Sequence, residues 1–334
     1  MFAPPTFLYS CSRGGPEDGK PPLGLDEFEE LPGVMGLWSD DRWVLLSHAW
    51  LDERITGTIE LHDVRELEGA FSGRSVAQVH RTVFYGEDGR KIAELYKTVI
   101  RVDRSESRAR GKYVDTPEPR YSDDDLRRIH EQYESEVARR RGPRTLYWDD
   151  VQPGDEMITL LKGPLTMTNL VGWQQGWGSL LCQTNRIAYQ TLRDYPGSRL
   201  FNPESGIEDT LAGGHWDPYF TAMGGMARGY DFGGQRISWL AHLLTDWCGD
   251  DGFVAEHHVR LLRPNFLGDC TWITGVVKSK QENLEPARSE LGSEYGAVEC
   301  EVTATNQRRD VTATARAIVG LPKRQESQGG GACA

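Results

Sequence analysis

Apolar residues recur at helical spacing in residues 234–247. Side chains three and four positions apart share one face of a helix, and here Trp239 and Leu243 broaden that face. The pattern predicts a helix that is buried on most sides, ends at the polar residues 249–252 and is followed by strands from Phe253. The apolar face consists of Ile237, Leu240, Ala241 and Leu244.

A second helical pattern, in residues 122–141, is amphipathic. Ser122 is a typical N-cap residue, acidic residues fill the first turn, and arginines 139–141 close the helix before Gly142-Pro143. Its apolar positions are Leu126, Ile129, Tyr133 and Val137. We interpret this segment as a helical connector between two halves of the chain.

Strand patterns repeat between the first and the last third of the chain. Residues 52–59 match 269–277, and residues 89–100 match 308–319. Short polar turns such as Asp88-Gly89 indicate hairpins, and therefore antiparallel sheets. We expect the two sheets to join edge to edge. The predicted division is a first half at 1–115, a helical linker at 116–145, a second half at 146–323 and a disordered tail at 324–334; residues 195–214 are expected to run over the surface.

Charge and composition exclude several classes of protein. The chain has 334 residues and a net charge of −12, which would repel nucleic acid and anionic membrane surfaces. No apolar run approaches the roughly 20 residues that span a bilayer, and the N-terminus lacks the pattern of a signal peptide. The six cysteines form no CxxC pair. We expect a cytoplasmic protein with reduced thiols that binds neither nucleic acid nor membrane.

The candidate chemistry centres on one histidine. The sequence contains no GxSxG elbow, no GxxxxGK[ST] loop and no HExxH helix, and the adjacent His257 and His258 would point to opposite faces of a strand, so we expect no metal site there. His215 lies in the segment 213–220, and the glycines at 233–234 begin the predicted buried helix. N–H groups at a helix start can stabilise an oxyanion, and a histidine can move a proton. Alternatively, this histidine only bonds a backbone carbonyl.

Four segments carry a resemblance to a known family: residues 2–7 (FAPPTF), 31–38 (LPGVMGLW), 215–218 (HWDP) and 263–269 (RPNFLGD). Together they resemble the MaoC-like hydratases and dehydratases, and more closely the two-halved members with a FAS1-like dehydratase domain at the N-terminus. The resemblance covers residues 2–320. It implies an α+β double hotdog, in which each half is a long helix wrapped by an antiparallel sheet. It also implies substrates that are acyl thioesters of coenzyme A or a carrier protein.

The resemblance implies that the second half is catalytic. Family members carry an Asp, four intervening residues and then His-x-Asp-Pro, and a glycine that binds the thioester carbonyl follows the histidine by eighteen positions. His215 and Gly233 match this pattern, but Thr210 stands where the acid is expected. The candidates for the displaced acid are Asp209, one position earlier and our first choice, followed by Asp217, which could instead cap the next helix, and Asp231.

The first half lacks this catalytic pattern and is expected to shape an acyl tunnel. The apolar residues suited to its walls are Phe7, Leu37, Trp38, Trp43 and Trp50. In the second half, the residues suited to binding the thioester carrier near the tunnel mouth are Gly234, Arg236, Arg260 and Arg263. We expect no cofactor, no metal and a homodimer or larger homo-oligomer.

The leading hypothesis is hydration of a 2-enoyl thioester, or the reverse dehydration of a 3-hydroxyacyl thioester. The displaced acid leaves two alternatives open. One is a hotdog enzyme of altered chemistry, which would be an isomerase, a cyclase or a thioesterase. The other is a non-catalytic subunit that binds the thioester and completes a partner's site.

Overall fold

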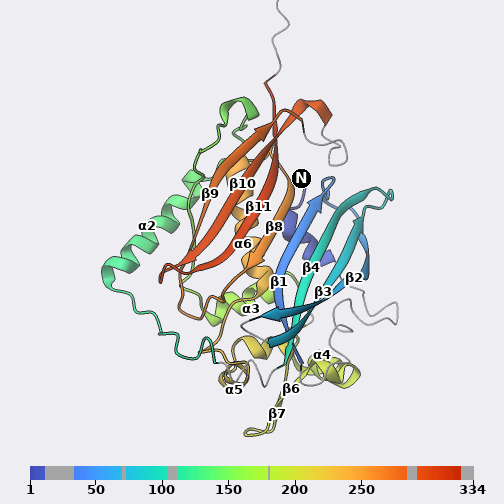
Figure 1. Cartoon of the computed structure of the whole chain (residues 1–334), viewed down its shortest axis with the longest axis vertical. Helices are drawn as coiled ribbons and strands as arrows, with labels where there is room; N and C mark the ends of the chain where they lie inside the picture. The colour runs from blue at the N-terminus through green and yellow to red at the C-terminus, as the bar shows by residue number, and fades with distance from the viewer. Residues whose placement is uncertain (12–33, 70–72, 104–110, 180, 284–291, 325–334) are drawn as a thin grey trace, which may run out of the picture.

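The computed structural model describes residues 1–11, 34–69, 73–103, 111–179, 181–283 and 292–324. Within these ranges, nine strands form one antiparallel sheet in the order β2-β3-β4-β1-β8-β11-β10-β9-β5 (Figure 1). The strands are β1 (Val34–Leu45), β2 (Thr56–Gly69), β3 (Gly73–Tyr85), β4 (Lys91–Asp103), β5 (Leu160–Lys162), β8 (Phe253–Leu261), β9 (Thr271–Gln281), β10 (Tyr295–Asn306) and β11 (Val311–Pro322).

The two halves of the sheet meet where β1 pairs with β8, with Trp43 opposite His257. On one side of this junction the order is β1, β4, β3, β2, and on the other it is β8, β11, β10, β9. The repeated segments of the sequence accordingly lie at equivalent strands, β2 with β9 and β4 with β11. The expected joining of two related antiparallel sheets, edge to edge, is confirmed.

The second half is built around α6 (Gly233–Cys248), which contacts β1 and each of the strands β8 to β11. The predicted apolar face of this helix is confirmed as part of the core, since Ile237, Leu240, Ala241 and Leu244 are at most 2% exposed. Burying one such leucine or isoleucine contributes about 1.5–3 kcal/mol. The helix ends at Gly249, whose φ of 74° suits a residue without a Cβ atom.

The first half contributes a shorter helical element to the core. Its described residues contain the 3₁₀ helix η1 (Pro5–Cys11), whose Leu8 and Tyr9 are buried and which contacts α6. The sequence led us to expect a long helix here too, as in the second half. Residues 12–33 lie outside the described ranges, so the described part of this half presents only the seven-residue η1.

The predicted connecting helix is α2 (Asp123–Arg139), and Figure 1 shows it on the outside of the molecule beside β9. Ser122 and Asp125 form a capping box, in which each side chain bonds the other's backbone N–H. Ile129 is buried with Leu161 of β5 and Cys270. Of the four predicted apolar positions only Ile129 is buried, whereas Leu126, Tyr133 and Val137 are exposed, so the connector packs against the second half mainly through Ile129.

The other described elements lie around the start of α6 and at the periphery. The predicted surface segment 195–214 contains a two-stranded hairpin whose Phe201 and Ile207 are exposed. No helix in the described ranges combines the length and the apolar character needed to cross a membrane. The predicted tail lies outside the described residues, apart from residue 324. These elements are α3 (Met167–Gly176), α4 (Asn185–Asp194), α5 (Pro218–Met223), β6 (Arg199–Asn202), β7 (Ile207–Thr210), η4 (Trp148–Asp150), η5 (Pro196–Ser198), η6 (Leu211–His215) and η8 (Gly292–Glu294).

His257, in β8, lies fully inside the core, and neither ring nitrogen bonds any of the described residues. Burial lowers its pKa to about 3, from 6.5 in an exposed histidine. The unfolded chain therefore binds a proton that the folded chain excludes, and stability is lost as the pH falls from 6.5 towards 3. Between pH 7 and pH 5 this residue should cost about 2 kcal/mol.

A His257→Leu variant should remove that loss, because leucine keeps the core filled and cannot bind a proton. Urea denaturation at pH 7 and pH 5 measures it: the stability of the variant should decline less than that of the parent. The matched control is His62→Leu on the exposed face of β2, which should keep the parent's decline. An equal decline in His257→Leu and the parent would contradict the prediction.

Candidate functional site

His215 ends the short helix η6, and its ring packs beside the residues that lead into α6. Its ring centroid is 3.8 Å from that of Phe232 and 4.4 Å from that of Tyr230. The Tyr230 N–H donates to the His215 carbonyl oxygen at 2.9 Å, and His215 Nδ1 lies 3.2 Å from the Tyr230 carbonyl oxygen. This pair of contacts holds the imidazole at the entrance to α6.

The contact with the Tyr230 carbonyl oxygen determines which ring nitrogen of His215 carries the proton. A carbonyl oxygen only accepts hydrogen bonds, so the proton of the neutral ring belongs on Nδ1 and the lone pair on Nε2. Burial lowers the pKa of His215 to about 4, although the backbone carbonyls nearby favour the charged form. At neutral pH the ring is therefore uncharged, and Nε2 can accept a proton.

Gly233 and Gly234 begin α6, and no side chain of the described residues caps this end of the helix. The N–H groups of a first turn have no acceptor within their own helix, and the helix dipole adds partial positive charge there. A Cβ atom at Gly233 would lie 2.9 Å from Leu261 Cδ1 and equally close to Trp38 Cβ. Glycine is required at this position because the backbone approaches two other elements so closely.

Asp209 lies in β7, and its carboxylate packs against the backbone of Gly213 in η6, where a Cβ atom would lie 2.9 Å from Asp209 Cγ. The Thr210 N–H donates to Asp209 Oδ1 at 2.7 Å. Burial, together with the nearby Asp217 carboxylate, raises the pKa of the Asp209 carboxyl. Thr210, at the family's acidic position, is buried and donates its hydroxyl to the Leu181 carbonyl oxygen. Asp209, which precedes η6 in the chain, therefore lies directly against this short helix.

Asp217 occupies the N-cap of α5 and accepts hydrogen bonds from the N–H groups of Tyr219 and Phe220, at 2.8 and 3.3 Å. The capping role considered from the sequence is thus confirmed. Both bonds go to the same oxygen, Oδ1, which holds the carboxylate on the helix. This geometry favours a structural role for Asp217.

Asp231 and Arg236 form a buried ion pair, with side chains at most 4% exposed. Both Asp231 oxygens accept from the guanidinium, and they also accept from the N–H and the side-chain amide of Asn265 at 3.0 and 2.9 Å. Arg236 also donates to the carbonyl oxygens of Arg263 and Thr312. This network joins the start of α6 to the segment after β8, and it leaves Arg236 no surface for a substrate.

The remaining candidates for carrier binding are Gly234, Arg260 and Arg263. Gly234 is buried in the first turn of α6. The Arg263 side chain is 51% exposed and pairs with Asp310 at 3.2 Å. Arg260 in β8 is also exposed, so Arg260 and Arg263 are the candidate arginines that can reach a ligand from solvent.

Comparison with solved structures identifies the architecture. A MaoC-like dehydratase superimposes with a TM-score of 0.60 at 18% identity, over 96% of this chain and 84% of the other. A conserved hypothetical protein from Mycobacterium tuberculosis, described as having a double hotdog fold, superimposes with a TM-score of 0.51 at 11% identity, over 96% and 82% of the two chains. The fold is a double hotdog. No protein-family model and no curated protein sequence matches the chain.

The first half of the double hotdog contributes to the candidate site through Trp38 of β1, whose indole lies against Gly233 and Gly234. Among the residues suggested as tunnel walls, Trp43 is buried in the core, whereas Phe7 and Trp50 are about half exposed. The contact of Trp38 with α6 joins residues from opposite ends of the chain. The sequence suggested Trp38 as a tunnel wall but did not predict its contact with α6.

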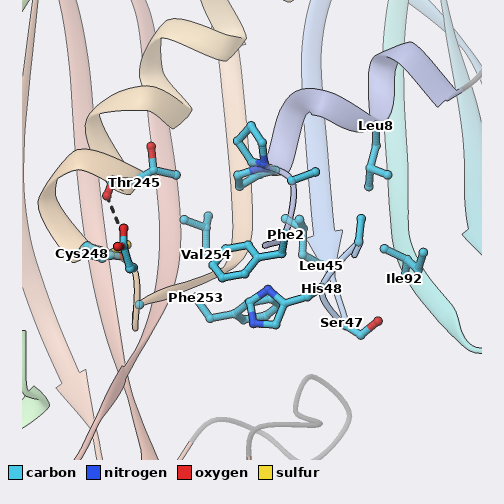
Figure 2. Close-up of a pocket in the computed structure, with 17 residues that line it drawn as sticks. Phe2, Leu8, Leu45, Ser47, His48, Ile92, Thr245, Cys248, Phe253 and Val254 are labelled. Carbon is cyan, nitrogen blue, oxygen red and sulfur yellow. Dashed lines mark hydrogen bonds between the residues drawn. The ribbon is translucent and has the colours of Figure 1, made fainter. Parts of the chain in front are cut away.

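The double hotdog also contains a cavity of about 190 Å³ at the other end of α6, close to Cys248 (Figure 2). The rings of Phe2, His48 and Phe253 line it together. Because a 16-residue helix is about 24 Å long, this cavity is remote from Gly233. It is therefore separate from the His215 site.

Glu136, His242 and Asp246 form the group that could hold a metal ion within the described ranges. Lys162 already supplies a cation there, with Nζ 3.0 Å from His242 Nδ1 and 3.7 Å from Glu136 Oε1. His242 Nε2 lies 3.2 Å from Asp246 Oδ2. Lys162 offsets one of the two carboxylate charges, and these contacts tie α2, β5 and α6 of the double hotdog together.

Proposed function

We propose that this chain hydrates a 2-enoyl thioester or carries out the reverse dehydration of a 3-hydroxyacyl thioester. The observation that carries the proposal is the neutral imidazole of His215, with Nε2 available, beside the uncapped start of α6. A base next to an oxyanion-binding helix start is what addition of water to an enoyl thioester requires. The fold shared with a MaoC-like dehydratase supports the same reaction class.

In the proposed reaction His215 Nε2 takes a proton from water, and the oxygen bonds to C3 of the substrate. The double-bond electrons move onto the thioester oxygen, where the N–H of Gly233 stabilises the enolate. Asp209, a carboxyl whose pKa is raised by burial, gives a proton to C2. Transfer of the proton from the imidazolium to the Asp209 carboxylate then restores both groups.

The test of the acid is an Asp209→Asn variant, which keeps the shape of the side chain but removes its acidic proton. Hydration of trans-2-enoyl thioesters, followed by the loss of absorbance of the conjugated double bond, should slow by about a hundredfold or more. The matched control is Glu208→Gln, which neutralises the adjacent exposed carboxylate that pairs with Arg199 and should leave the rate unchanged.

A rate for Asp209→Asn equal to that of the parent would exclude Asp209 as the acid. If the parent also produced an isomerised, cyclised or hydrolysed product from the thioester, the altered-chemistry alternative would replace hydration. Binding without any turnover would favour the non-catalytic alternative. The thioester carrier, the cytoplasmic location and the homo-oligomeric state stay predictions from the sequence.

A further inference from the structure

Two indoles lie on the first turn of α6, one from each half of the chain. A Cβ atom at Gly234 would lie 3.0 Å from Trp38 Cη2 and 2.9 Å from Trp173 Cη2, while one at Gly233 would lie 2.9 Å from Trp38 Cβ and Cγ. The Trp38 ring therefore runs along both glycines, from Cβ at the first to Cη2 at the second. Indoles from both halves therefore cover the Cα side of the two glycines whose N–H groups are proposed to bind the thioester oxygen.

Trp38 is held in this position by buried polar contacts. Its Nε1–H donates to Asp41 Oδ1 at 2.5 Å, and the Tyr9 hydroxyl donates to Asp41 Oδ2. Asp41 is fully buried, so turning the indole away would leave Asp41 Oδ1 desolvated and without this donor. The Lys97 ammonium lies 5.5 Å from the centroid of the Trp38 ring. Rotation of the indole away from α6 is therefore costly.

Further aromatic rings close the gap between the two indoles. Trp173 stacks with Phe232 at 5.9 Å between ring centroids and lies 5.0 Å from Trp177. Tyr9 contacts Trp177 at 5.9 Å and Trp38 at 5.7 Å. Rings of both halves thus surround the start of α6 in a packed arrangement, and packed interiors do not make room for extra methylenes without strain.

We propose that Trp38, together with Trp173, limits the substrate to short acyl chains by occupying the space that a longer chain would need beside Gly233. The inference rests on the proposed function, because it places the thioester carbonyl at the start of α6. An acyl group of about four carbons needs no room beyond the helix start, whereas a ten-carbon chain extends into the positions of the indoles. Trp38 acts here as a determinant of specificity and takes no part in proton transfer.

The test compares the pantetheine thioesters of short and long acyl groups, since pantetheine is common to coenzyme A and carrier proteins. Turnover is measured with crotonyl and trans-2-decenoyl pantetheine, and binding with the saturated butanoyl and decanoyl compounds. The parent should prefer the short compound at least tenfold in both measurements. Trp38→Ala should shift the ratio at least tenfold towards the long compound, since each blocked methylene is worth about tenfold or more.

Trp148→Ala, which removes the indole of η4 that donates to the Ala297 carbonyl oxygen, is the matched control and should keep the parent's ratio. If Trp38→Ala does not fold, as shown by circular dichroism, Trp173→Leu replaces it and should shift the ratio in the same direction. A parent that turns over the decenoyl compound as well as the crotonyl compound would overturn the inference and leave the proposed function standing.

A length preference in binding, lost in the variants but without turnover by the parent, would support the inference while the proposed function fails. Absence of binding by both saturated compounds would overturn the inference. An unchanged ratio in folded variants would also overturn it, because the indoles would then not limit the chain.

Discussion

Replacing His215 by asparagine should lower the rate of enoyl-thioester hydration by at least about a hundredfold, since the proposed base is lost. The asparagine side-chain amide can still donate to the Tyr230 carbonyl oxygen, as Nδ1 of the imidazole does. The variant therefore lacks the basic nitrogen that corresponds to Nε2 while keeping the contact that positions the side chain. Steady-state kinetics should show the loss in kcat, with a melting temperature near that of the parent.

The matched control is His62→Asn, on an exposed part of β2, which should keep the parent's rate. The pH profile adds a second readout: because the pKa of His215 is about 4, the base is active above that pH, and kcat/KM should decline as the pH falls through it. Undiminished turnover by His215→Asn would remove His215 from the reaction and leave its bond to Tyr230 as its role.

Replacing Asp231 by alanine should lower the free energy of unfolding by about 3–5 kcal/mol, because it leaves the Arg236 charge buried without its partner. Asn265 also loses the acceptor of its N–H and its side-chain amide. Urea denaturation at pH 7 measures the effect. The matched control is Asp310→Ala, which breaks the half-exposed pair with Arg263 and should cost at most about 1 kcal/mol.

Measuring both stability and turnover of Asp231→Ala distinguishes a structural role of Asp231 from a catalytic one. A structural role predicts that Asp231→Ala loses stability, and that turnover by the fraction still folded stays within a few-fold of the parent. A variant as stable as the parent but without turnover would instead make Asp231 the acid that the sequence left open. Asp209→Asn would then show no loss.

The sequence by itself determined the architecture, because the signals for its elements are local. The apolar face of residues 237–244 requires burial at a period that only a helix provides, and the capping residues at Ser122 and Asp125 satisfy N–H groups within one turn. The repeat predicted equivalent strands in the two halves, which the structure places in mirrored order around β1 and β8. Resemblance in a few short segments was sufficient to name the double hotdog.

The role of each side chain at the start of α6 was decided only by tertiary structure. Asp209, Asp217 and Asp231 are chemically identical in the sequence, yet one packs on a glycine backbone, one caps a helix and one neutralises a buried arginine. A carboxylate's pKa and availability depend on burial and on donors that come from distant segments, such as Asn265. The contact of Trp38 with Gly233 likewise follows from the pairing of β1 with β8, which no local pattern encodes.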